Sequence, residues 1–177
     1  MEVSVAVVMS LDGKLTRHDK SGSKELASSE EQQHFYALMA EYGIVVMGSG
    51  TYKVIKGSLN HRADLLRIVL TSKAPSYELE SMPGKLEFSM ETPGQLVDRL
   101  ESQGHNKLLI VGGPQMISDF LAAKLISKLY VTVEPRLFGQ GKPLLSDLPV
   151  DVKLELIKHE RLNTQGTLLL TYEVISN

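Results

Sequence analysis

The sequence predicts an α/β fold with a mixed, mainly parallel central sheet, flanked by helices and completed by antiparallel strands near the C-terminus. Up to residue 123, short apolar runs rich in β-branched residues alternate with helical patterns, as they do in parallel crossover units. After residue 128, three strand-like runs follow one another without a good intervening helix, which favours antiparallel pairing. No repeat or linker interrupts the chain, so we expect a single domain over residues 1–177.

The predicted strands are short and mostly apolar, as is typical of strands that are buried on both faces. They cover residues 3–9, 44–47, 65–70, 86–88, 108–111, 129–134, 154–161 and 168–175. The run over residues 3–9 is almost wholly apolar and predicts a central strand. Residues 163–166 (Asn-Thr-Gln-Gly) separate the last two strands in the manner of a hairpin connection.

Capping residues mark the predicted helices. Ser28 or Ser29, ahead of Glu31, resembles an N-cap that opens a helix through about Tyr42, and Gly43 is its expected stop. The other predicted helices are a short helix or turn that ends near residue 54, one that opens at residues 92–95, and one over residues 115–123.

Composition excludes several classes of function. The 19 Lys and Arg residues and 21 Asp and Glu residues give a formal charge of -2 without an extended basic run, so nucleic acid is not an expected partner. Cysteine is absent, which excludes disulfides, thiolate metal sites and cysteine nucleophiles. The five histidines are scattered without ligand spacing, so we expect no metal site.

The same composition predicts an ordinary globular protein. The hydrophobic share is 42% and the charged share 23%, both near globular averages. The N-terminal run lacks the basic flank and cleavage site of a signal peptide, and no apolar stretch approaches the roughly 20 residues that span a bilayer. We therefore expect a cytoplasmic protein that does not enter a membrane.

Two strand ends carry glycine-containing corners: residues 48–51 (Gly-Ser-Gly-Thr) and residues 112–115 (Gly-Gly-Pro-Gln). Backbone amides at the start of a helix suit a phosphate or pyrophosphate, and glycine lets such a ligand approach the backbone. The alternative is a pair of tight turns that need glycine only for their geometry. Neither corner is a dinucleotide-binding GxGxxG motif or a Walker loop, so the pattern indicates a nucleotide site without identifying it.

Four segments, in this order, carry a family resemblance. They are residues 10–14 (Ser-Leu-Asp-Gly-Lys), 47–52 (Met-Gly-Ser-Gly-Thr-Tyr), 110–114 (Ile-Val-Gly-Gly-Pro) and 134–145 (Glu-Pro-Arg-Leu-Phe-Gly-Gln-Gly-Lys-Pro-Leu-Leu). Together they resemble the RibD C-terminal domain family, the reductase half of the bacterial deaminase-reductase of riboflavin biosynthesis. The resemblance spans nearly the whole chain and implies a dihydrofolate-reductase-like fold.

The resemblance also implies NADPH as the cofactor, bound across the sheet. Its implied contacts are Val8 and Met9 beside the nicotinamide, Gly48, Ser49, Gly50 and Thr51 at the phosphates, Thr71 and Ser72 on the adenosine side, and Gly112, Gly113, Pro114, Gln115 and Met116 at the pyrophosphate. For the last segment, the resemblance agrees with the reading from helix-start chemistry alone.

Substrate positions match the family less well. Ser23 and Arg62 correspond to its substrate-binding positions, and Arg62 to a phosphate-contacting arginine. The family's acidic pair and proline are replaced by residues 54–57 (Val-Ile-Lys-Gly), its acidic residue before the glycine turn is Val111, and its tryptophan is absent, with Glu25 near that place. These departures leave the substrate open.

The function implied first is reduction of the ribosylamino sugar of 5-amino-6-(5-phosphoribosylamino)uracil. Reduction of a pterin such as dihydrofolate, or of another imine-bearing heterocycle, is the alternative reductase reading. A nucleotide-binding module without turnover is the alternative of another class, because the acidic substrate positions are missing. The resemblance further implies a homodimer.

Three single residues have competing interpretations. Asp12 is the weak candidate for a catalytic residue, a proton donor, but an Asp before Gly more often bonds the backbone of its own turn. Glu134, at a strand end, either faces the pocket or is an exposed edge carboxylate. Tyr52 either forms an aromatic wall of the site or packs in the core.

Overall fold

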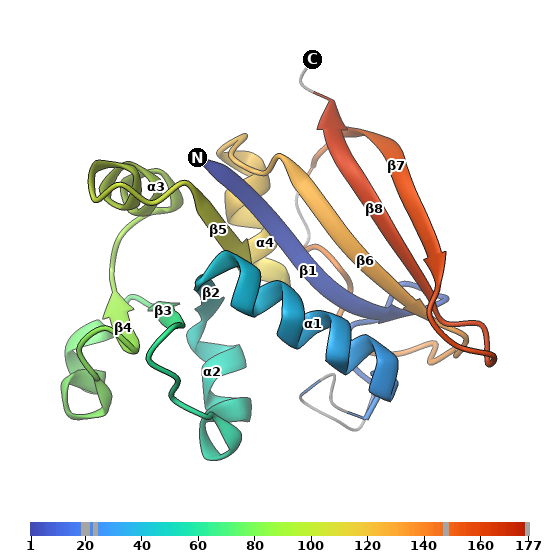
Figure 1. Cartoon of the computed structure of the whole chain (residues 1–177), viewed down its shortest axis with the longest axis horizontal. Coiled ribbons are helices and arrows are strands. Elements are labelled where there is room, and N and C mark those ends of the chain that lie inside the picture. The colour runs from blue at the N-terminus through green and yellow to red at the C-terminus, as the bar shows by residue number, and fades with distance from the viewer. Residues whose placement is uncertain (19–21, 23–24, 147–148, 176–177) are drawn as a thin grey trace.

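The structure is a computed structural model that describes residues 1–18, 22, 25–146 and 149–175. Within these residues one sheet of eight strands, in the order β4-β3-β2-β5-β1-β6-β8-β7, runs from β4 at its left edge to β7 at its right edge (Figure 1). The strands are β1 (Glu2–Ser10), β2 (Ile44–Gly48), β3 (Leu66–Leu70), β4 (Leu86–Ser89), β5 (Lys107–Ile110), β6 (Lys128–Glu134), β7 (Lys153–Arg161) and β8 (Leu168–Ile175). The helices are α1 (Ser29–Tyr42), α2 (Ser49–Ile55), α3 (Pro93–Ser102) and α4 (Pro114–Ala122).

Strand directions confirm the predicted mixed sheet. The strands from β4 to β6 are parallel to their neighbours, whereas β8 is antiparallel to both β6 and β7. The chain therefore changes from helical crossovers to direct strand pairing after β6. The antiparallel prediction for the last third holds for the pairs β6–β8 and β8–β7. The other edge of β6 pairs with β1, and that pairing is parallel.

Two short helical turns were not predicted from the sequence. The 3-10 helix η1 (Lys56–Ser58) continues α2, and η2 (Ala74–Glu80) joins β3 to β4. Neither turn buries a residue, so no apolar period marks them in the sequence. The predicted longer elements differ from the observed ones by only a residue or two at their ends.

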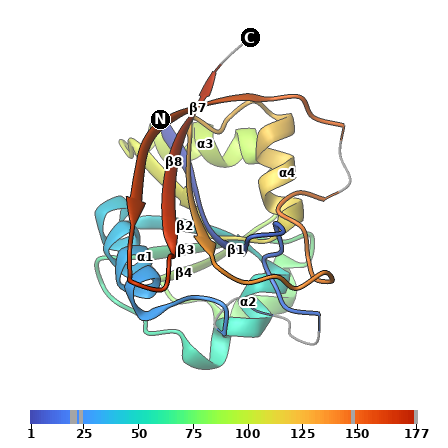
Figure 2. The ribbon, with the colours of Figure 1, turned by 90° about the vertical axis from the view of Figure 1, so that its right-hand side faces the viewer.

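The core lies on both faces of the sheet because strand residues alternate between the faces. Val5 and Val7 of β1 pack in one cluster with apolar residues of α3 and α4, and Ala6 packs in the other with residues of α1 and Tyr52. Figure 2 shows α1 and α4 on opposite sides of the strands. The face that α1 covers also carries the cavity described below.

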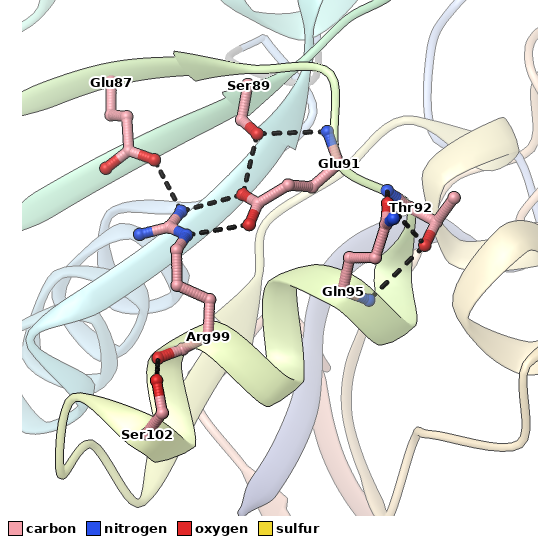
Figure 3. A network of polar contacts seen from close by, with 7 residues as sticks. All are labelled: Glu87, Ser89, Glu91, Thr92, Gln95, Arg99 and Ser102. Carbon is pink, nitrogen blue, oxygen red and sulfur yellow. Dashed lines mark hydrogen bonds and ion pairs between the residues drawn. The ribbon is translucent and has the colours of Figure 1, made fainter.

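The sequence signal for α3 is realised as a complete capping box. Thr92 accepts a hydrogen bond from the Gln95 amide, and the Gln95 side chain accepts one from the Thr92 amide. One turn later the Arg99 guanidinium donates to both oxygens of Glu91, at 2.8 and 2.9 Å, and also to Glu87 of β4 (Figure 3). These contacts tie α3 to the edge of the parallel sheet.

Candidate functional site

The two glycine corners that were found in the sequence meet in the structure. β2 and β5 are neighbours, and the Val111 amide donates to the Val46 carbonyl at 2.9 Å just before the second corner. Gly112 and Gly113 have φ angles of 129° and 91°, which favour glycine. A Cβ at Gly113 would lie 3.5 Å from the Thr51 Oγ1 atom of the first corner. Thr51, which follows β2, and Gly113, which follows β5, thus form one shared corner of the site.

Backbone donors stand next to this corner, at the start of α4. Gly113 is the N-cap and provides no side-chain cap, and Pro114 follows it without an N–H group. The amides of Gln115 and Met116 stand in the first turn, where no helical carbonyl precedes them. Amides of this kind, with the partial positive charge of the helix start, can bind an anion.

A cavity of about 600 Å³ opens beside this corner, between α1, α2 and the sheet. That volume lies within the roughly 300 to 1,000 Å³ typical of small-molecule sites. Of the residues proposed from the sequence, those that line it are Val8, Gly50, Thr51, Arg62, Gly112, Gly113 and Pro114. The ones that do not line it are Met9, Gly48, Ser49, Thr71, Ser72, Gln115 and Met116. Ser23 lies outside the described residues.

One face of α1 forms a long wall of the cavity. The lining positions on this helix are Glu31, Gln32, Phe35, Tyr36, Met39 and Ala40. Their spacing of three to four residues places them on one side of the helix. Met39 lies eight positions after Glu31, so this stretch of the wall is about 12 Å long.

Glu31 is a cavity residue that the sequence analysis assigned only to the start of a helix. Its side chain is 5% exposed, and burial, followed by the nearby charge of Glu134, raises the pKa of its carboxyl to about 7. A signal was present in the sequence, because Glu31 shares a helical face with Phe35 and Met39.

Glu134 does not fit either interpretation offered from the sequence. It is buried, outside the lining of the cavity, and it accepts hydrogen bonds from the Ser28 amide at 2.7 Å and from the Thr167 hydroxyl at 2.6 Å. The prediction of an exposed edge carboxylate is wrong because β8 covers this side of β6. Glu134 instead joins the start of α1 to the start of β8.

Arg67 is a second charged residue that the sequence analysis missed in the cavity wall. It lies in β3, is 5% exposed, and has a buried Nη1 atom with no hydrogen-bond partner among the described residues. Arg62, which was predicted from the resemblance, also lines the cavity but is exposed and donates through Nε and Nη2 to both oxygens of Asp64. The missed signal was a charge within an otherwise apolar, buried strand.

Asp12 makes the contacts expected of a structural turn residue. It accepts hydrogen bonds from the Ser10 hydroxyl at 2.6 Å, the Phe138 amide at 3.1 Å and the Gly139 amide at 2.7 Å. These bonds, the one from Ser10 above all, lower the pKa of its carboxyl to about 2. An acid that stays ionised at neutral pH holds no proton to donate, so this geometry favours the structural interpretation.

Tyr52 packs in the core, as one of its two interpretations stated. Its ring lies edge-on to Tyr77 and Phe88, and its hydroxyl donates to Glu80 at 2.6 Å. Tyr52 therefore helps to hold α2, and with it Thr51, against the sheet.

Among the histidines, His34 and His61 are half-buried and the other three are exposed.

The described residues contain no cluster of metal-binding side chains and no helix that could span a membrane. In those ranges, no three His, Asp or Glu side chains gather in a way that could hold a metal ion. None of the helices among them has the length and apolar character required to cross a bilayer.

Solved structures share this arrangement over nearly the whole chain. A Shewanella sp. PV-4 protein assigned provisionally to riboflavin biosynthesis has a TM-score of 0.78 and 23% identity, with coverage of 99% of this chain and 100% of that one. A pyrimidine reductase-like protein of Corynebacterium diphtheriae has a TM-score of 0.77, 17% identity and coverage of 99% and 92%. At these identities the likeness shows a common fold, the reductase fold of the dihydrofolate-reductase type.

The Thermotoga maritima diaminohydroxyphosphoribosylaminopyrimidine deaminase/5-amino-6-(5-phosphoribosylamino)uracil reductase matches with a TM-score of 0.76 and 19% identity. This chain is covered over 98% of its length but spans only 56% of that enzyme. In sequence, the uncharacterized protein YwjB of Bacillus subtilis is 26% identical over 156 residues, which are 85% of this chain and 86% of YwjB. The RibD C-terminal domain family matches residues 2–168, and the chain belongs to that family.

Proposed function

We propose that the protein is an NADPH-dependent reductase of a small heterocyclic substrate. The observation that carries the proposal is the single cavity that joins both glycine corners to a buried carboxyl on α1. Family membership supports an oxidoreductase in general. The cofactor, the substrate and the roles of the residues are part of the proposal.

The corner formed by Thr51, Gly112 and Gly113 fits the phosphates of a dinucleotide. Side chains at either glycine would fill the space in front of the Thr51 hydroxyl, which lies 3.5 to 3.8 Å from the Cβ positions. Thr51 can donate its hydroxyl hydrogen, and the first turn of α4 adds backbone amides. We assign the pyrophosphate to this corner and the nicotinamide to the end of β1 near Val8.

NADPH, when bound, supplies a hydride. Addition of hydride to an imine or carbonyl carbon leaves negative charge on its nitrogen or oxygen, and a proton must neutralise that charge. The Glu31 carboxyl is the group in the cavity wall suited to hold this proton on one of its oxygens, because its pKa of about 7 leaves it partly protonated at neutral pH. Apolar lining residues such as Val7, Phe35 and Met39 would exclude water around it.

Two substrates fit this chemistry. The first is the ribosylamino sugar of 5-amino-6-(5-phosphoribosylamino)uracil, because the Thermotoga relative is a reductase of that compound and this chain matches it over 98% of its own length. The second is an imine-bearing heterocycle such as a pterin. Glu31 favours such a heterocycle, because a buried acid beside the ring would supply the proton for the imine nitrogen.

The test is a titration with NADPH and NADH followed by incubation with the pyrimidine and with dihydrofolate, monitored by the near-ultraviolet absorbance of the reduced nicotinamide. Loss of absorbance with one of the two compounds identifies that compound as the substrate. Tight NADPH binding without turnover would support a nucleotide-binding module, and absence of NADPH binding would refute the assignment of the corner.

We also propose that the protein is a homodimer and that β7 contributes to the interface. Every residue of β7 is exposed, although it carries Leu154, Leu156 and Ile157, and β8 adds the exposed Leu168 and Ile175. An apolar ribbon at a sheet edge is suited to self-association. Sedimentation of the protein and of a Leu156→Lys, Ile157→Lys variant tests this, with the variant expected to be monomeric.

A further inference from the structure

Arg67 is a buried arginine within the central sheet. This residue is the second of β3, where it pairs with Val45 of β2 and Leu86 of β4, so it lies inside the sheet. Strand alternation places its side chain on the same face as Val69, which packs in the cluster that includes α1 residues. The guanidinium therefore points to the side of the sheet that carries the cavity, and Arg67 is one of the lining residues.

A buried arginine needs partners. Burial of a charge without an opposite charge or hydrogen bonds is costly, and arginine is rarely fully buried unless it is paired. The Nη1 atom of Arg67 is buried and has no partner among the described residues. Burial is also the main cause that lowers the pKa of Arg67, and the charge of Arg62 acts in the same direction without a compensating carboxylate. Among the described residues, the Nη1 atom of Arg67 is thus buried without an acceptor.

Arg62 does not meet that need and is itself already paired. Its Nε and Nη2 atoms donate to the two oxygens of Asp64 at 2.9 and 2.5 Å, in the fork geometry that an anionic ligand would otherwise use. Its side chain is also about half exposed to solvent. Of these two cavity arginines, Arg67 is the one with a buried donor that lacks a partner among the described residues.

We propose that Arg67 is the residue that binds an oxyanion group of the ligand, a phosphate monoester or a carboxylate, in this cavity. Both groups are acceptors that match the planar donor fork of arginine. An oxyanion at this position would accept a hydrogen bond from the unpartnered Nη1 atom and pair with the charge of Arg67.

The location separates this group from the proposed pyrophosphate corner. Arg67 stands near the amino end of the parallel strand β3, whereas Thr51 and Gly113 follow the carboxyl ends of β2 and β5. The cavity that these residues line also runs along about 12 Å of α1. This proposal rests on the proposed function, because it takes the ligand to be the substrate. The substrate then carries its anion at the end that is remote from the cofactor phosphates.

The experiment measures binding of two probes, ribose 5-phosphate for the phosphate and glutarate for the carboxylate, to the full chain by ligand-observed NMR. Ribose is the uncharged control. We expect at least one anionic probe to bind the wild-type protein, with affinity lowered about tenfold or more in Arg67→Met, because hydrogen bonds to charged groups are lost. Lys85→Met removes a positive charge from the edge of the neighbouring strand, outside the cavity lining, and should bind the probe as the wild type does.

Arg67→Lys is included as a second variant so that the test still works if Arg67→Met fails to fold. It keeps the charge and much of the length but not the fork, so we expect a folded protein with weakened probe binding. Equal affinity in wild type, Arg67→Met and Arg67→Lys would overturn the proposal, and so would failure of both probes to bind the wild type. NADPH titrations run in parallel separate the two proposals. Arg67→Met should keep the NADPH affinity, and a wild type that binds a probe but not NADPH refutes the proposed function alone.

Discussion

The Thr51 hydroxyl oxygen lies 3.5 Å from the position that a Cβ of Gly113 would take, although 62 positions along the chain separate the two residues. Parallel pairing of β2 with β5 brings them together, with Val46 opposite Ile110. The contact means that the two corners act as one site. A charge placed at Gly113 should therefore interact electrostatically with any anion that Thr51 binds.

Gly113→Asp should lower NADPH affinity much more than Gly113→Asn does. Both variants carry a side chain of the same shape and meet the same strain at a φ angle of 91°, so they differ essentially in charge. A carboxylate about 4 Å from a phosphate costs on the order of 1 to 4 kcal/mol, or at least several-fold in affinity. Calorimetric titration of both variants at low and high salt measures the effect. Equal affinities would show that no cofactor phosphate occupies this corner.

Glu31→Gln should stabilise the protein above neutral pH. Because the pKa of Glu31 is raised from 4.5 to about 7, the native state is favoured while the carboxyl is protonated, and this contribution is lost as the pH rises from 4.5 through 7. Removal of the ionisable group should add on the order of 2 kcal/mol near pH 8 and almost nothing near pH 4. Urea unfolding at the two pH values measures the difference. Glu30→Gln, on the exposed side of the same helix, is the control and should show no such gain.

The same substitution tests the proposed proton source. If the Glu31 carboxyl holds the proton that follows the hydride, the rate of the wild-type reaction should fall as the pH rises through about 7. Glu31→Gln should reduce the rate about a hundredfold and abolish this decline. A pH profile of kcat for both proteins is the measurement. A variant with the full rate and an unchanged profile would leave Glu31 as a packing residue only.

The contrast between Gly113 and Arg67 shows which parts of the site a sequence can reveal. Glycine at a strand end reports a local backbone requirement, so both corners could be identified from neighbouring residues alone. Arg67 and Glu31 sit within patterns that indicate a buried strand and a helix start, and these patterns are correct. Whether their charged atoms find partners depends on elements distant in the chain. The strand order, in which β1 lies between β5 and β6, likewise follows from tertiary packing.

Gly141→Ala should disrupt the loop that borders the cavity. A Cβ at Gly141 would lie 1.9 Å from the Thr16 carbonyl oxygen, and that backbone is also held by the Lys142 amide, which donates to Thr16 Oγ1 at 3.0 Å. Thr16 and Lys142 both line the cavity, so the clash should distort the site. We expect a loss of about 3 kcal/mol in unfolding free energy, at the upper end of overpacking effects.

Gly139→Ala is the matched control in the same loop. Its φ angle is 67°, but no atom lies within 4 Å of the added Cβ. Only the backbone penalty of about 1 kcal/mol should remain. Similar losses for the two variants in chemical unfolding would contradict the close approach of Gly141 to Thr16.

Asp12→Asn should lower stability in a way that depends on pH. Because hydrogen bonds from Ser10, Phe138 and Gly139 lower the pKa of Asp12 from 3.8 to about 2, the ionised carboxylate stabilises the native state above pH 4. That contribution is lost as the pH falls towards 2, where the carboxyl protonates. Wild type should therefore have a higher Tm than Asp12→Asn near pH 6, and the gap should narrow between about pH 4 and pH 2. Asp98→Asn, at an exposed position of α3, should show no gap, and a constant gap for Asp12→Asn would mean that its charge does not hold the loop.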